Sequence, residues 1–125
     1  MAIARQTDAE LIKPGLQAVT RRVKLGATTS AGEIIELQSD GKWDPAAASA
    51  AISNAAVAIQ GGADGQTVDA VFFGPVSCLT GATVGAEVYV SDTAGEPTET
   101  PGTNPATIGF AESATVLFVN FFKTI

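Results

Sequence analysis

Two stretches of the chain decide its fold: VKLGATTSAGEIIELQSDGKW, residues 23–43, and VSCLTGATVGAEVYVSDTAGEP, residues 76–97. Each runs from a short apolar strand into Gly-Ala-Thr, then through a Gly and a Glu into a second apolar strand that ends in a Ser-Asp turn. Another short strand follows each stretch, at residues 55–60 or 107–112. Short strands between glycine-rich turns are typical of all-β domains. The likeness has two explanations, an internal repeat or common turn chemistry, and both stay open.

Other segments alternate apolar and polar residues as strands do. Arg21 interrupts the apolar side of the first of them, residues 17–25, which predicts an edge or subunit-contacting strand. With about eight strands in all, we predict a small β-barrel or sandwich. We expect a single domain over residues 17–125, preceded by an extended N-terminal arm, residues 1–16.

Three local signals refine this prediction. Asp44 followed by Pro45 is typical of a helix start, and the alanines after it favour one to three helical turns up to residue 54, although a strand-rich context often overrides such a preference. Gly41 is expected to take a positive φ in a turn. Gly74-Pro75 predicts a bulge or bend in the strand that contains it.

Charge is unevenly distributed along the chain. Residues 1–24 hold five of the seven basic side chains and two of the thirteen acidic ones, which gives this part a net charge of +3 and the rest −9. An acidic body repels phosphate backbones, so we expect no nucleic-acid partner. The basic residues either grip an acidic protein surface or only keep the arm solvated. Neither a signal peptide nor an apolar run of about 18 residues occurs, so we expect cytoplasmic synthesis and no membrane partner.

The residue types that most enzymes need are scarce. The chain has no histidine and a single cysteine, Cys78, which we expect to be a small buried apolar residue. Ser/His/Asp and Cys/His arrangements and zinc sites are therefore excluded. The close acidic pairs fit turns better than acid–base catalysis or calcium binding. They are Asp40 with Asp44, Asp64 with Asp69, and Asp92 with Glu96. We predict no catalytic residues, no cofactor and no metal.

The closing run ATVLFVNFF, residues 114–122, is apolar on both sides. Leu117, Val119 and Phe121 share one side, and Val116, Phe118 and Phe122 share the other. Such a strand is covered twice, either within a barrel or by another subunit. Many of the other apolar residues are alanines, so the core is thin, and oligomerisation or docking on a partner is expected to support it.

Three segments resemble the capsid decoration, or cement, proteins of tailed bacteriophages: SAGEIIEL (residues 30–37), TGATVGAEVYVSDTAGEPT (80–98) and IGFAESATVLF (108–118). The likeness spans about residues 23–122 and rests on strand and turn patterns. Members of that family are compact β-domains, commonly trimers, on the outer face of the shell. The resemblance implies a structural protein that is not an enzyme, with the major capsid protein and its own copies as partners and the virion surface as its location.

We assign contacts on this basis. The capsid contact is predicted to use basic residues of the arm and first strand, namely Arg5, Lys13, Arg21, Arg22 and Lys24. The contact between subunits is predicted to use Phe118, Phe121 and Phe122. A carbohydrate-binding or adhesive module is the alternative, with Trp43 and Tyr89 as sugar-stacking platforms. Trp43 would otherwise anchor a partner or pack over the alanine-rich segment.

Overall fold

The computed structural model of the chain describes the backbone of residues 4–5 and 18–123 and the side chains of residues 18–121. Within this part of the chain the regular structure is all strand, so the predicted all-β fold is confirmed. The predicted arm, with Lys13, lies outside the described residues apart from residues 4–5. The strands are β1 (Ala4–Arg5), β2 (Val19–Lys24), β3 (Ile34–Leu37), β4 (Trp43–Pro45), β5 (Ala56–Ala58), β6 (Thr67–Ser77), β7 (Leu79–Thr80), β8 (Glu87–Val90), β9 (Pro97–Thr98), β10 (Ala106–Ala111) and β11 (Val116–Lys123).

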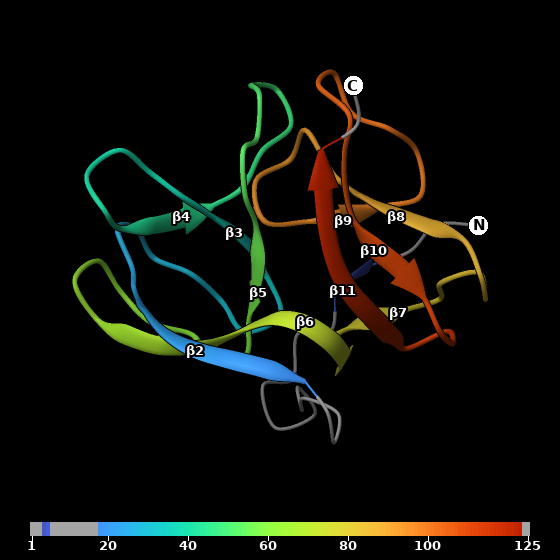
Figure 1. Cartoon of the computed structure of the whole chain (residues 1–125), viewed down its shortest axis with the longest axis horizontal. Helices are drawn as coiled ribbons and strands as arrows, with labels where there is room; N and C mark the ends of the chain where they lie inside the picture. The colour runs from blue at the N-terminus through green and yellow to red at the C-terminus, as the bar shows by residue number, and fades with distance from the viewer. Residues whose placement is uncertain (1–3, 6–17, 124–125) are drawn as a thin grey trace.

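One antiparallel sheet contains nine of these strands, in the order β4-β3-β5-β6-β11-β10-β8-β9, and β2 pairs with β6 as well. The long strand β6 joins two groups, because its first half pairs with β2 and β5 and its second half with β11. Figure 1 shows β2 to β5 on the left and β7 to β11 on the right, with β6 passing between them. β1 pairs separately with β7.

The two groups are copies of one β unit. In the first, the Gly32 amide donates to the Ala58 carbonyl at 2.7 Å and the Ala58 amide to the Glu33 carbonyl at 2.9 Å. In the second, Gly85 and Ala111 make the same pair of bonds at 2.8 and 2.9 Å, with Ala86 in the place of Glu33. The hairpin β3-β4 corresponds to β8-β9, β5 to β10, β2 to the second half of β6, and the first half of β6 to β11. The likeness seen in the sequence is therefore an internal structural repeat.

The strand registers fix which residues correspond. In the first group, Ile34 pairs with Val57, and Val57 pairs with Val71. In the second group, Glu87 pairs with Phe110, and Phe110 pairs with Phe118. The following list gives the correspondences used below: Arg21 with Val76, Ile34 with Glu87, Ala56 with Gly109, Val57 with Phe110, Val71 with Phe118, and Phe72 with Val119. We call the two copies unit 1 (residues 19–72) and unit 2 (residues 74–121).

Each unit encloses a buried cluster. In unit 1 a bridge between Leu25 and Trp43, with the Gly26 amide donating to the Trp43 carbonyl at 2.8 Å, brings the free edges together around a small, alanine-rich interior. The interior of unit 2 includes Val88, Leu117 and Val119 and is larger, because residues of unit 1 join the same cluster. The expected burial of Cys78, which is 2% exposed, is confirmed.

The predicted helix after Asp44 is wrong. Residues 43–45 form β4, and residues 46–55 cross the molecule as an irregular connection. The Ala46 amide donates to the Ile34 carbonyl and the Ala48 amide to the Ser91 carbonyl, both at 2.8 Å. Ala46 and Ala48 are completely buried, because a methyl side chain lets the backbone approach the sheets closely. Tertiary hydrogen bonds and packing thus override helix propensity here.

Of two expectations about glycine, one holds and the other is displaced. Gly41 has a φ of +84° in its turn, as predicted. The bulge expected at Gly74-Pro75 lies at Phe72, two residues before Gly74. Phe72 is the extra residue between the pairs Thr20–Val71 and Val19–Phe73. Gly74 itself has a φ of +114° and lies against the backbone of Ala18, which leaves no space for a side chain.

Candidate functional site: the exposed face of unit 2

Aromatic rings collect on the outer side of unit 2. Phe110 on β10 lies directly opposite Phe118 on β11, and their rings stack with centroids 5.3 Å apart. Phe73 on β6 meets Phe118 edge to face, with centroids 5.2 Å apart, and Val19 on β2 pairs with Phe73. We call these four residues the aromatic face. They lie together because β2, β6, β11 and β10 are consecutive neighbours in the sheet.

The aromatic face is open to solvent. Val19, Phe73 and Phe110 are 50%, 46% and 41% exposed, and Phe118 is half-buried. At the corresponding positions of unit 1, Val57 and Val71 are completely buried. The same side of the repeated sheet is therefore covered in unit 1 and carries larger, exposed rings in unit 2. A contiguous exposed apolar patch on a small domain is typical of a surface that binds another molecule.

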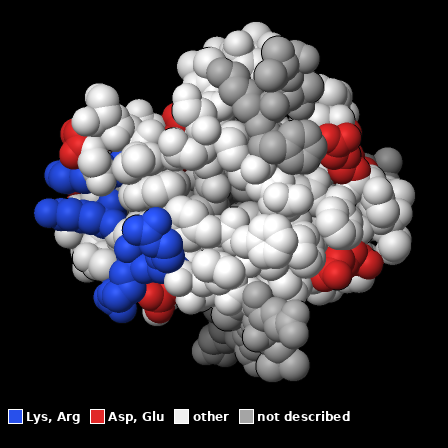
Figure 2. Space-filling model, in the orientation of Figure 1, with Lys and Arg blue, Asp and Glu red and all other residues white. Residues whose placement is uncertain are grey.

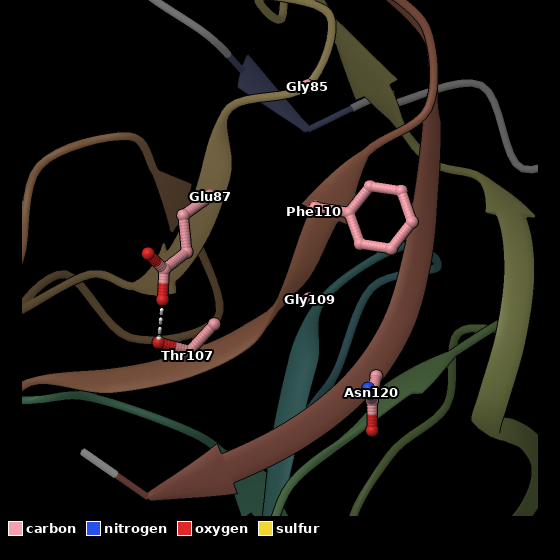
Figure 3. A pocket seen from close by; sticks show the side chains of 6 residues that line it. All are labelled: Gly85, Glu87, Thr107, Gly109, Phe110 and Asn120. Carbon is pink, nitrogen blue, oxygen red and sulfur yellow. Dashed lines mark hydrogen bonds between the residues drawn. The ribbon is translucent and has the colours of Figure 1, made fainter.

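A pocket of about 350 Å³ adjoins the aromatic face. Its lining residues are Gly85, Glu87, Thr107, Gly109, Phe110 and Asn120. Figure 3 shows the Glu87 side chain on one side of Gly109 and the Phe110 ring on the other, with Asn120 projecting from the next strand. The pocket thus combines a carboxylate, an amide and an aromatic ring, which can bind a cationic or a polyhydroxylated group.

The Glu87 carboxylate is held by two hydroxyl groups. Thr107 donates to Oε2 at 2.7 Å and Tyr89 to Oε1 at 3.2 Å. A carboxylate accepts about four hydrogen bonds, so each oxygen retains capacity for a ligand. The pKa of Tyr89 is raised, first by desolvation and then by its hydrogen bond to Glu87 and the negative charge there. The network fixes the direction in which Glu87 can accept further bonds.

The predicted capsid-binding set is split between two places and the undescribed arm. Arg21, Arg22 and Lys24 are exposed together on β2. Arg5 is in β1 beside β7, and Figure 1 shows that strand apart from β2. In Figure 2 basic side chains gather at the left of the molecule, with a few acidic ones among them, and acidic side chains stand at the right beyond a broad uncharged surface. Lys13 lies outside the described residues.

Individual contacts of β2 distinguish its two arginines. The Arg21 guanidinium lies 5.4 Å from the centre of the Phe72 ring, a cation–π distance. Arg22 makes a solvent-exposed ion pair of 3.7 Å with Asp69, which contributes little to stability. Arg21 is therefore the arginine that lies beside aromatic groups.

The predicted subunit-contact residues take different positions. Phe118 is part of the aromatic face, whereas Phe121 packs partly buried against the core of unit 2. The side chain of Phe122 lies outside the described residues. Residues 117, 119 and 121 share the inner side, as their spacing predicts. Sequence reasoning missed Phe73, Phe110 and the Glu87 pocket.

The two predicted sugar platforms do not meet. Trp43 is on β4 and Tyr89 on β8, near opposite ends of the strand order. Trp43 is half-buried and packs edge to face on Phe72, with ring centroids 5.4 Å apart, against the core of unit 1. Any aromatic stacking of a ligand by these two residues would therefore occur at separate places.

Acidic residues elsewhere serve turns and loops. Asp40 accepts from the Lys42 amide at 2.9 Å within its turn. Asp92 accepts from the Thr103 amide at 2.9 Å and hydroxyl at 2.7 Å, and these bonds lower its pKa. Partial burial raises the pKa of Asp44, and the charges of Asp40 and Asp64 add to this. Among the residues that the structure describes, no three His, Cys, Asp or Glu side chains are placed to hold a metal ion.

Neither a protein-family model nor any curated protein matches the sequence. In the described ranges, 4–5 and 18–123, no helix has the length and apolar character needed to cross a membrane.

Proposed function

We propose that the protein is a structural decoration protein of a tailed-bacteriophage capsid. It binds the outer surface of the shell between major capsid protein subunits and stabilises the shell as a homotrimer. It is made in the host cytoplasm and ends on the virion surface. One observation carries the proposal: a rigid two-unit β body leaves an aromatic face open on one unit while the equivalent face of the other unit is buried.

In this proposal, different surfaces of the protein make the contact between copies and the contact with the shell. Phe118 and its neighbours in the aromatic face supply the contact between copies, because exposed rings gain most from burial against protein. Arg5, in a strand that pairs with β7 and not with the strands of the aromatic face, supplies the shell contact together with Lys13, the other basic residue predicted for it in the arm. Repeated attachment of trimers makes overall binding tight even when each contact is weak.

Co-sedimentation with purified mature shells tests the proposal. We expect the wild-type protein to pellet with shells and to raise their resistance to heat or chelation. The double variant Arg5→Glu/Lys13→Glu should remain folded and bind less, whereas Lys42→Glu, which also reverses a charge, should bind normally. Normal binding by the double variant would refute the assignment of the shell contact, and failure of the wild type to bind any shell would refute the function.

A carbohydrate-binding or adhesive module is the second candidate. The observation in its favour is the pocket, where Glu87 and Asn120 lie beside the exposed ring of Phe110. A glycan array with the wild-type protein separates the two functions. Saturable binding of a defined glycan, lost in Glu87→Gln, would favour the module, and a silent array favours the structural role.

A further inference from the structure

The chemistry of the pocket suits an arginine side chain. A guanidinium group donates two parallel hydrogen bonds to a carboxylate and stacks on aromatic rings. Glu87 has one accepting position left on each oxygen, and the Phe110 ring stands across the pocket from it. The Asn120 amide oxygen can accept a further N–H bond.

The internal repeat indicates what covers the aromatic face. The outer side of unit 1, with Ile34, Val57 and Val71, is buried in one cluster with residues of unit 2 that include Val76 and Val119. In this junction, unit 2, which follows unit 1 in the chain, covers the outer side of unit 1. The outer side of unit 2 has no following unit within the described residues. A second copy of the chain would supply one, because its unit 1 has the same architecture as unit 2.

The side of unit 1 that would make this junction is also open. Val76 and Val119 of unit 2 are 1% and 0% exposed, and their counterparts in unit 1 are Arg21, which is exposed, and Phe72, which is half-buried. Both surfaces that correspond to the internal junction thus carry exposed side chains, one surface on each unit, and in unit 1 Trp43 and Arg21 cover Phe72 in part.

The residues at these two open surfaces are complementary in charge. In the internal junction, Ile34 and Val76 belong to the same apolar cluster. Their counterparts are Glu87 and Arg21. Two apolar members of one buried cluster therefore have an acid and a base as their counterparts on the two open surfaces. Complementary charges of this kind select the partner and its orientation.

Arg21 cannot reach Glu87 of its own chain. The strands β2, β6, β11, β10 and β8 are consecutive, so the two residues are separated by four strand spacings, or about 19 Å. An Arg21 side chain in the pocket would therefore come from another molecule. Because donor and acceptor lie at different places on each copy, the contact is head-to-tail, and such a contact forms a ring when the rotation between copies closes, as the proposed trimer requires.

We infer that the Glu87 pocket receives the Arg21 side chain of a second copy of this chain, with the aromatic face of one copy packed against the open side of unit 1 of the next. This inference deepens the proposed function, since it assigns the contact between the copies of the homotrimer.

Charge exchange tests the contact in solution without shells. Arg21→Glu and Glu87→Arg each place like charges in the junction, so each should weaken self-association about tenfold or more. The double variant Arg21→Glu/Glu87→Arg restores opposite charges at every junction and should associate nearly as the wild type does. Lys24→Glu changes the net charge as Arg21→Glu does, on the same strand, and should associate normally. Light scattering over a concentration series gives the mass, and near-ultraviolet circular dichroism confirms that each variant is folded.

The other possible results of these experiments either overturn the inference or point to a different occupant of the pocket, except for the last one below. Single variants that associate like the wild type, or a double variant that does not recover, would overturn the inference. A wild-type monomer that binds shells only while Glu87 is intact would place the arginine on the capsid protein instead. A glycan that binds the pocket of a monomer would make it a sugar site. Self-association as expected, without shell binding, would leave the inference standing and refute the proposed function.

Discussion

Gly109 offers the sharpest test of the strand register beneath the pocket. A Cβ atom at this position would overlap the backbone carbonyl oxygen of Phe118 and lie 3.3 Å from the Asn120 nitrogen. The counterpart in unit 1 is Ala56, whose Cβ is accommodated in a buried position. Gly109→Ala is thus a minimal change that the first unit tolerates and the second should not, because β10 and β11 approach more closely and shift register there.

The expected magnitude follows from two costs. Moving β10 away from β11 leaves a buried backbone group unpaired, at about 1–3 kcal/mol, and repacking the neighbours costs about 1–3 kcal/mol more. We expect Gly109→Ala to lower the free energy of unfolding by about 3 kcal/mol or more. Gly65→Ala is the control, because Gly65 has a φ of +90° with no atom within 4 Å of its added Cβ. A left-handed alanine costs about 1–2 kcal/mol, partly offset by a stiffer unfolded chain.

Urea unfolding followed by fluorescence measures both variants, since Trp43 is the single tryptophan and packs on the core of unit 1. We expect a lower midpoint for Gly109→Ala with an unchanged m-value, and a shift roughly one third as large for Gly65→Ala. Equal shifts for the two alanines would refute the close approach of β10 to β11. The geometry assigned to the base of the pocket would then be wrong as well.

Three further predictions concern titration and packing. Glu87→Gln should lower the pKa of Tyr89 towards its ordinary value of 10.0, which an absorbance titration reads directly because the chain has one tyrosine; an unchanged pKa would contradict the bond between them. The pKa of Asp92 lies below its ordinary value of 3.8, so its bonds stabilise the fold above that pH and are lost as pH falls through the lowered pKa. The melting temperature of Thr103→Val should therefore fall less than that of the wild type when the pH is lowered from roughly 5 to 2. An equal fall in both proteins would argue against the hydrogen bond from the Thr103 hydroxyl. Leu117→Ala, at a fully buried site, should cost about 2–5 kcal/mol in the same urea assay, and a cost under about 1 kcal/mol would show that the site is not core.

The local sequence pattern was sufficient to predict much of the fold. The spacing of the last strand placed Leu117, Val119 and Phe121 on one side, and that side faces the core. The turn glycine Gly41 was predicted because its conformation depends on the residues beside it. These features are decided within a few residues of the chain, which is the range that a sequence pattern describes.

Long-range contacts decided the features that were missed. Residues 46–55 form no helix because their amides and methyl groups are used by strands far away in the sequence. The pocket brings together residues of β8, β10 and β11, and no spacing in the sequence predicts that. One signal was available in the strands that follow the two similar stretches: residues 55–60 have an alanine and a valine where residues 107–112 have a glycine and a phenylalanine, and the strand register matches Ala56 with Gly109 and Val57 with Phe110. Unit 2 thus has a phenylalanine where unit 1 has a valine, and a glycine where unit 1 has an alanine, and these two positions mark where the repeats differ.

The difference between the units can be traced to their connections. After the first hairpin, the chain contributes Ala46, Ala48, Ile52 and Ala55 to the cluster that buries Val57 and Val71. After the second hairpin, residues 99–105 contain charged, proline and threonine side chains, and most of them are half-buried or exposed. They have no apolar side chains with which to cover Phe110 and Phe118. The second connection leaves open the surface that the first one helps to bury, and this is the surface that we assign to a second copy of the chain.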